Sequence, residues 1–419
     1  MPASRRAFLA GSGLLAASGV GVWQRRRIVR YPELEAMREA ADHPVPSFEA
    51  GVPVADAHLE AAHDRTAERI EEFHATVADE HNRSSIADIG ERHDAESPSE
   101  LESATRAERR EALDSYRSSV RSAAGIFARE RFEDRELDRT DAAERVETER
   151  AALAAVERSY RGESLTDAVV ANGQVDERHL EASYRIDSAE NRDLQDGLEF
   201  SWSWRDLVTA DVHRRDAERH ARGVDGDDYE ERLDAALENA LEAVEESVDG
   251  VDWGHEDAER NYAAFMIVGA GPFGGRHSDV SARESRAEGG YLASGLQLAV
   301  YHHVHYERLD ALAEIPDSGE WAAVGWTVDA DALPERKRAA VAAIEEALEA
   351  HDDPLVRWLL ASPADTLEQA DDRLGRQIDG ANDADDEQWQ RSINEYYARC
   401  LEAETFATQV PTSVEALLE

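Results

Sequence analysis

The sequence predicts an all-α protein, a helical bundle or elongated helical array, with at most a short β-hairpin near residues 320–328. Apolar residues recur at three- and four-residue steps through most of the chain, which is the spacing of an amphipathic helix. Alternating strand patterns are few, and the best of them lies between Trp321 and Val328. The apolar stripes are narrow and flanked by charged residues, which is typical of helices packed on one face.

Three segments carry the clearest helix signals. The first spans residues 56–82, and the second spans 229–248 with Gly250 after its end. The third contains residues 341–348 and has Pro334 in its first turn, where the missing N–H of proline costs little. Similar stripes lie near residues 101–131, 140–160, 204–220, 283–313 and 386–408.

The charge of the chain limits the classes of function. Its 419 residues include 91 acidic and 46 basic ones, which gives a formal net charge of −45. Lys337 is the only lysine, and the acids are spread along the whole chain. This composition resembles that of proteins from extreme halophiles, where molar salt shortens the Debye length to about 3 Å and screens repulsion between carboxylates. Phosphate contacts need clustered lysine and arginine, so we expect no nucleic-acid binding.

The N-terminal residues 1–30 contrast with the rest because they contain six arginines and no acid. The order Ser-Arg-Arg-Ala-Phe-Leu at residues 4–9 is followed by a weakly apolar run, and this order resembles a twin-arginine export signal. The position after the motif, often lysine in such signals, is Ala10. The resemblance implies that the twin-arginine translocase exports the folded protein. The signal residues are then Arg5, Arg6, Phe8 and Leu9.

The fate of the signal is open. Cleavage after the small residues near Ala17 would give a secreted protein, whereas an uncleaved segment 7–23 would hold the chain in the cytoplasmic membrane as a transmembrane helix. We expect the rest of the chain to lie outside that membrane. The arginines at 25–27 leave an alternative, because the positive-inside rule would then favour an anchored protein with a cytoplasmic C-terminal region.

Composition suggests four segments along the chain. Residues 31–54 contain several prolines and are expected to form an extended linker. The boundary near residue 248 precedes a more apolar part of the sequence. The segments are 1–30, a signal or membrane anchor; 31–54, a linker; 55–247, a charged helical domain; and 248–419, a more apolar helical domain.

A histidine cluster is the first candidate for a functional site. His302 and His305 lie three residues apart on one face of an apolar helix, and His277 lies in a nearby loop. Imidazoles at this spacing can ligate a divalent metal. The simpler interpretation is that these rings line the edge of a core and bond to their neighbours. The first interpretation predicts a metal site, and the second predicts no cofactor.

Other motifs are weaker. Residues 269–274 match the glycine pattern of a dinucleotide site, but Pro272 would interrupt the phosphate turn and no β-α-β alternation surrounds it. The single cysteine, Cys400, is expected to be a small buried residue of a helix. The tryptophans at 202 and 204 are expected to anchor a core rather than to line a ligand groove.

These observations favour a protein that binds or assembles over one that catalyses. The sequence predicts a membrane-tethered or secreted helical binding or assembly protein of a halophile, with no catalytic motif among those we considered. The alternative is an exported metal-binding protein or enzyme that uses His277, His302 and His305. The protein partner and ligand stay open.

Overall fold

The computed structural model describes residues 31–52, 54–98, 106–250, 286–287, 289–312, 327–380 and 384–418. Within these ranges nearly all regular structure is helical, and the predicted all-α class is confirmed. The strands β1 (Arg161–Gly162) and β2 (Asp227–Asp228) form one short antiparallel pair. The described residues form two compact units: an N-terminal unit, 51–234 with 286–295, and a C-terminal unit made of the other described residues.

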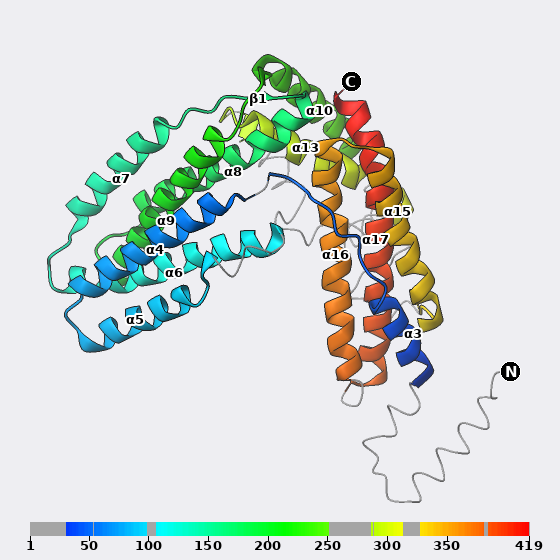
Figure 1. Ribbon diagram of the computed structural model, residues 1–419, viewed down its shortest axis with the longest axis horizontal. Coiled ribbons are helices and arrows are strands. Elements are labelled where there is room, and N and C mark those ends of the chain that lie inside the picture. The colour runs from blue at the N-terminus through cyan, green and yellow to red at the C-terminus, as the bar shows by residue number, and fades with distance from the viewer. Residues whose placement is uncertain are drawn as a thin grey trace, which may run out of the picture. The chain divides into compact units, whose positions relative to one another are not determined.

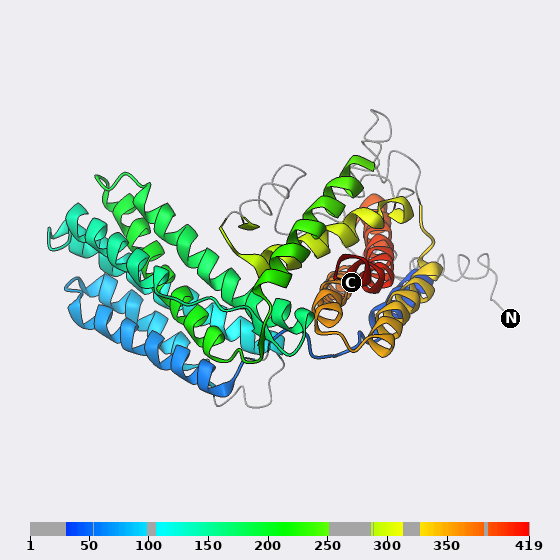
Figure 2. The ribbon, with the colours of Figure 1, turned by 90° about the horizontal axis from the view of Figure 1, so that it is seen from above.

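The N-terminal unit is built on long helices that run side by side (Figures 1 and 2). Helix α9 packs against α6, α7 and α8, and α4 packs against α5 and α6. The helices are α4 (Asp56–Thr76), α5 (Glu80–Asp94), α6 (Arg106–Glu133), α7 (Arg139–Ala154), α8 (Leu165–Glu190) and α9 (Gly197–Arg222). Helices α10 (Glu230–Gly250) and α13 (Leu292–Glu307) each contribute residues to both units.

Burial in the N-terminal unit follows the predicted helical spacing. On α4 the residues Leu59, Ala62, Ile70 and Phe73 are buried at steps that keep them on one face of the helix. Phe73 continues into a core with Phe200 and other apolar residues of α5, α6 and α9. The stripe is narrow, so charged residues border the core on both sides.

The helix expected over residues 56–82 is interrupted, which corrects its predicted length. The backbone leaves the helix at Val77, and α5 starts again after Asp79, whose side chain accepts a hydrogen bond from the Asn82 N–H at 3.0 Å. Glu130 of α6 accepts the N–H of Ala78 at 2.5 Å and the N–H of Asp79 at 3.0 Å. The break is therefore stabilised by a residue distant in sequence, which a local periodicity cannot reveal.

The C-terminal unit contains a bundle in which α17 packs against α15 and α16, and α3 covers both of those helices (Figure 1). Pro334 lies in the first turn of α15, as predicted. The elements of the bundle and its connections are α3 (Tyr31–Ala41), α14 (Leu309–Leu312), the 3₁₀ turn η2 (Ala330–Ala332), α15 (Leu333–Ala350), α16 (Pro354–Asp379) and α17 (Asp386–Leu418).

Helix α3 corrects the expectation that residues 31–54 form a linker. Leu34, Met37 and Ala40 are buried, and α3 packs on α15 and α16. The Trp389 indole N–H donates to the Glu33 carboxylate at 2.7 Å and ties α3 to α17. The described residues of this segment that follow α3 lack helix and strand.

Several predictions fall wholly or largely outside the described residues. The hairpin near 320–328 is described only at Thr327 and Val328, which are not in a strand. The segments 1–30 and 269–274 also lie outside, and the division at residue 248 stays a prediction. Among the helices of the described ranges, none combines the length and hydropathy needed to cross a membrane.

Asp176 of α8 holds residues 290–294 against the rest of the N-terminal unit. Its fully buried carboxylate accepts the backbone N–H of Ala293 at 3.0 Å and that of Ser294 at 3.2 Å. The Tyr160 hydroxyl has one proton to donate and lies within hydrogen-bond distance of two acceptors, the Gly290 carbonyl at 2.6 Å and the Asp176 carboxylate at 3.1 Å. Burial raises the pKa of Asp176 to about 6.

We predict that Asp176 makes folding stability depend on pH. A carboxyl whose pKa is raised by folding stabilises the protein most when protonated, so its contribution falls as pH rises from about 4 to about 6. The unfolding free energy of the natural protein should fall relative to that of Asp176→Asn by up to about 1.4 kcal/mol per pH unit in this window. Denaturant unfolding of both proteins in one molar-salt buffer measures the difference, and a pH-independent difference would contradict the prediction.

The only lysine lies inside the C-terminal bundle. Lys337 of α15 is fully buried, and its ammonium group donates to Asp371 of α16 at 2.6 Å. The Tyr396 hydroxyl of α17 donates to the other oxygen of Asp371 at 2.7 Å. One carboxylate therefore joins the three long helices of the bundle.

We predict that Lys337→Met destabilises the protein by about 3–5 kcal/mol, because it leaves the mostly buried Asp371 carboxylate without its cation. The matched control is Arg373→Gln of α16, which breaks an exposed pair with Glu395 of α17 in the same bundle and should cost no more than about 1 kcal/mol. Denaturant unfolding in high salt measures both variants. Equal losses would show that burial does not set the strength of the Lys337 pair.

Candidate functional site

The structure places His302 and His305 on α13, with both side chains buried. Arg308 donates a hydrogen bond to Nδ1 of His305 at 2.6 Å, and the ring of His305 packs against Tyr301 and Phe406. An Nδ1 atom that accepts this bond has its lone pair engaged, so it is not free to ligate a metal in this arrangement. Burial and the charge of Arg308 hold the pKa of His305 well below its usual value, so the ring is neutral.

The predicted metal site is incompletely described. His277 lies outside the described residues. Within the described ranges, no group of three or more His, Cys, Asp or Glu side chains is arranged to hold a metal ion. His303, which lies between the predicted ligands on α13, forms a hydrogen bond between its Nδ1 atom and the Ser413 hydroxyl at 3.0 Å. The metal site of His277, His302 and His305 stays a prediction.

Two other sequence-level expectations concern core residues. Cys400 is buried on α17, as expected, and burial raises the pKa of its thiol to about 12, so the nucleophilic thiolate does not form near neutral pH. Trp204 is buried in the N-terminal core, where its ring stacks with Phe200 at a centroid separation of 5.9 Å. Trp204 is thus a core anchor, as expected, whereas Trp202 is only partly buried and its ring centroid lies 5.5 Å from the Arg192 guanidinium.

The sequence did not single out a row of carboxylates on α9. Asp206, Asp211 and Asp216 follow one another at five-residue steps, and all three are buried, with exposed fractions of 1%, 8% and 1%. A buried carboxylate is costly unless cations and hydrogen-bond donors surround it. Arginines meet this need at each of the three positions.

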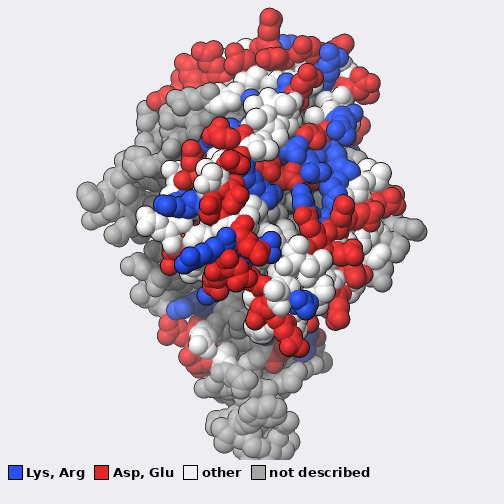
Figure 3. Space-filling model, turned by 90° about the vertical axis from the view of Figure 1, so that its left-hand side faces the viewer, with Lys and Arg blue, Asp and Glu red and all other residues white. Residues whose placement is uncertain are grey.

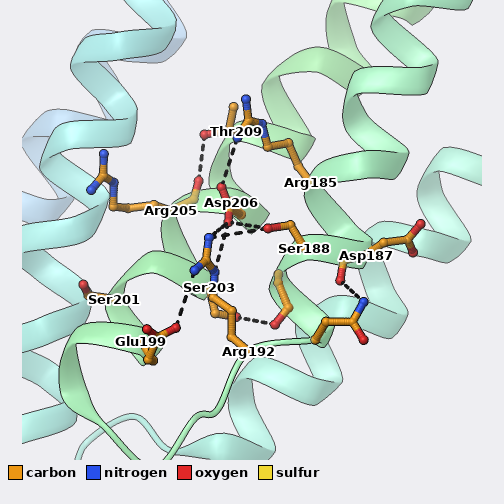
Figure 4. A network of polar contacts seen from close by, with 12 residues as sticks. Arg185, Asp187, Ser188, Arg192, Glu199, Ser201, Ser203, Arg205, Asp206 and Thr209 are labelled. Atoms are coloured by element: carbon orange, nitrogen blue, oxygen red, sulfur yellow. Dashed lines mark hydrogen bonds and ion pairs between the residues drawn. The ribbon is translucent and has the colours of Figure 1, made fainter. Parts of the chain in front are cut away.

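Asp206 is the first member of this row (Figure 4). Arg192 donates to its carboxylate at 2.8 Å, and the Ser188 hydroxyl donates at 3.1 Å. Arg185 of α8 donates to the other oxygen at 3.4 Å. Figure 4 shows these groups converging on Asp206 from α8 and the segment that follows it.

Asp216 is the last member of the row. Arg117 of α6 donates to one oxygen through Nε at 3.0 Å, and His58 of α4 lies 3.0 Å from the other oxygen through Nε2. Burial alone would raise the pKa of Asp216, but the hydrogen bond from His58 and the charge of Arg117 hold it below its usual range. Asp216 is therefore ionised, and both of its carboxylate oxygens are hydrogen-bonded to neighbouring side chains.

A cavity of about 250 Å³ opens between α4, α6, α7 and α9 beside this row. Apolar side chains form part of its wall, and the rest is charged. Its lining residues are Ala62, Arg65, Thr66, Glu68, Arg69, Glu72, Leu113, Tyr116, Arg117, Val120, Arg145, Val208, Asp211, Val212, Arg215 and Asp216. Five arginines and four acids thus line it, whereas acids outnumber basic residues about twofold in the whole chain. Figure 3 shows one face of the molecule, where acidic side chains are widespread and basic ones gather in places.

Three of the lining arginines are matched by lining acids. Arg117 pairs with Asp216, as described above. Arg215 donates to Asp211 at 2.9 Å, and Arg69 donates to the exposed Glu72 at 2.7 Å. These pairs fix the side chains and leave little of their charge for a ligand.

The other two lining arginines, Arg65 and Arg145, make no hydrogen bond to any residue that the structure describes. The carboxylate nearest to Arg145 is that of Glu149, at 3.7 Å, and the Arg145 guanidinium lies 4.8 Å from the ring centroid of Trp204. Burial lowers the pKa of Arg145, and burial together with Arg219 lowers that of Arg65. Each guanidinium has five N–H donors, so the cavity is lined by donors that have no hydrogen-bond acceptor among the described residues.

Sequence reasoning missed this site because arginines are frequent throughout the chain. The available signal was position: Arg65 follows the buried Ala62 by three residues, and Arg145 follows the buried Ala142 by three. Each arginine thus borders an apolar stripe of its helix. That signal does not show that the two side chains line one cavity, since α4 and α7 are far apart in sequence.

A comparison with known protein families finds a match in the C-terminal part of the chain, outside the cavity. Residues 230–419 match the model of a family described as a domain of unknown function (DUF8264). No curated protein matches the chain, and no solved structure matches it. The matched segment contains His302, His305 and Lys337, whereas the arginine-lined cavity precedes it. The C-terminal part of the chain is therefore similar to this family, and the match assigns no activity to the cavity.

Proposed function

We propose that this chain is a helical binding protein of a halophile that acts outside the cytoplasmic membrane, either tethered to it or secreted. Its binding site is the cavity between α4, α6, α7 and α9. The twin-arginine motif at Arg5 and Arg6 supports export, and segment 7–23 is the proposed membrane contact of a tethered form. The acidic composition supports function in strong salt.

The observation that carries the binding role is the pair of guanidinium groups without acceptors. Small-molecule sites are concave, largely apolar and provided with a few polar groups that orient the ligand. The cavity has this composition, with Leu113, Val120 and Val208 beside Arg65 and Arg145. A donor that faces a cavity and bonds to no protein group is satisfied by water or by a ligand.

The chemistry of the lining favours binding over catalysis. A general base needs a group that can accept a proton from the substrate. Asp211 and Asp216 are held as carboxylates by arginines, and His58 is engaged with Asp216. These groups are held in contacts within the protein and are not available to take a proton from a substrate. Arg65 and Arg145 stay protonated and serve to attract and orient a ligand.

A second candidate function is an exported metal-binding protein or enzyme that uses His277, His302 and His305. The observation that favours it is the placement of His302 and His305 three residues apart on α13. The bond from Arg308 to His305 would have to break before Nδ1 could reach a metal. We therefore rank this function second.

We predict that the full chain, produced in a halophilic host, is recovered from the membrane or the medium together with a small molecule. Cells are fractionated in high salt, the protein is purified and denatured, and the released compounds and metals are quantified by mass spectrometry and elemental analysis. The binding role predicts about one small molecule per chain and no stoichiometric metal.

The matched control for export is Arg5→Lys with Arg6→Lys, which keeps the charge and removes the paired guanidinium groups. This variant should accumulate in the cytoplasm. An unchanged distribution would contradict twin-arginine export. A stoichiometric metal that disappears in His302→Ala and His305→Ala, with no released small molecule, would replace the binding role by the second function.

A further inference from the structure

We infer that the cavity selects a small organic anion whose carboxylate or phosphate oxygens bind to Arg65 and Arg145. This inference rests on the proposed binding function and adds the chemical class of the ligand. Arg65 projects from α4 and Arg145 from α7, and both line the same cavity. Both also lie within electrostatic reach of Asp211.

Charge balance favours an anion over a cation. The lining acids Asp211 and Asp216 are paired with Arg215 and Arg117 at hydrogen-bond distances. Their negative charge is thus neutralised within the protein. Arg65 has no ion pair with any described residue, and Arg145 has only a long one, to the buried Glu149 at 3.7 Å, which Arg214 shares at 3.9 Å. An anion would neutralise the charge of Arg65 and the part of the Arg145 charge that this distant, shared pair leaves.

The two remaining acids of the lining do not cancel this charge. Glu68 and Glu72 are exposed to solvent, and Glu72 is paired with Arg69. Exposed charges are screened strongly by salt, and the Debye length is about 3 Å at 1 M. Arg65 and Arg145 are more buried, so their attraction for an anion is screened less than the repulsion from Glu68.

The geometry of guanidinium favours oxyanions over chloride. Its planar fork of N–H donors matches the paired oxygens of a carboxylate or phosphate, which can accept two parallel bonds. A spherical halide cannot form this bidentate pattern. Selection against chloride is a requirement for any anion site that works in molar salt.

The apolar wall favours an organic ligand. Leu113, Val120, Val208 and Val212 line the cavity together with the ring of Tyr116. Contact with the carbon atoms of a ligand removes these apolar side chains from water, which is favourable, whereas a bare inorganic ion offers no apolar surface to pack against them. The volume of about 250 Å³ lies just below the usual range of ligand pockets and restricts the ligand to a small molecule.

The test uses the purified full chain in about 2 M sodium chloride, where the Debye length is only a few ångströms. The probes are succinate, inorganic phosphate and the neutral analogue succinamide, titrated by calorimetry with sodium chloride as the reference. We expect succinate to bind, succinamide to bind at least about tenfold more weakly, and phosphate to show whether the site also accepts that oxyanion.

The variants are Arg65→Gln and Arg145→Gln, each expected to weaken succinate binding about tenfold or more because a charge-assisted hydrogen bond is lost. The matched control is Arg69→Gln, which lines the same cavity but is already paired with Glu72, and should change binding less than about threefold. Circular dichroism of all three variants confirms that they fold.

Four outcomes would overturn the inference. Equal affinity for succinate and succinamide would show that charge is not selected, and would leave the binding function intact. A loss of binding in Arg69→Gln as large as in Arg65→Gln would show that general charge is responsible. Binding of phosphate but not of succinate would replace the organic anion with an inorganic one. No binding of either oxyanion above the sodium chloride reference would exclude the proposed class, and the absence of any released small molecule would then remove the binding function too.

Discussion

Two buried carboxylates of one helix, Asp206 and Asp216, join α9 to other elements of the N-terminal unit. Asp206, Asp211 and Asp216 follow one another at five-residue steps on α9, so successive members point about 140° apart around the helix. The Asp206 carboxylate is hydrogen-bonded by Arg185 of α8 and by Arg192. The Asp216 carboxylate is hydrogen-bonded by His58 of α4 and by Arg117 of α6. Asp211 is instead paired with Arg214 and Arg215 of α9 itself. A carboxylate is buried at low cost only where cations and hydrogen-bond donors reach it, so the contacts of Asp206 and Asp216 favour the placement of α4, α6 and α8 around α9.

The same constraint explains the candidate site. Arginines brought inside to neutralise carboxylates must be matched closely, because an uncompensated buried charge is costly. Around the cavity this matching is complete for Arg117 and Arg215 and incomplete for Arg65 and Arg145. An imbalance of this kind is unfavourable for folding alone, and we propose that an anionic ligand supplies the missing negative charge.

Sequence reasoning succeeded where local pattern decides the structure and failed where distant residues decide it. The all-α class follows from apolar spacing, as do α10, where Asp228 caps the start, and α15, where Pro334 lies in the first turn. Gly250 was expected after the end of α10 and instead is its last residue. Helix α8 was not singled out, because buried polar residues such as Asn172 and Asp176 interrupt its stripe, and α16 was missed because Pro363 lies inside it. The break after α4 depends on Glu130, and the cavity depends on side chains that α4, α6, α7 and α9 bring together, which no local periodicity encodes.

The most direct test of this account compares Asp216→Asn with Asp114→Asn across salt concentrations. Both residues bond to Arg117, but Asp216 is buried and the Asp114 side chain is 66% exposed. Both variants are unfolded with denaturant between about 1 and 4 M salt, where surface pairs are already screened. At every salt concentration, Asp216→Asn should be less stable than Asp114→Asn by about 3 kcal/mol or more. A difference that vanishes as salt rises, or equal losses in the two variants, would contradict the claim that buried carboxylates of α9 organise the unit.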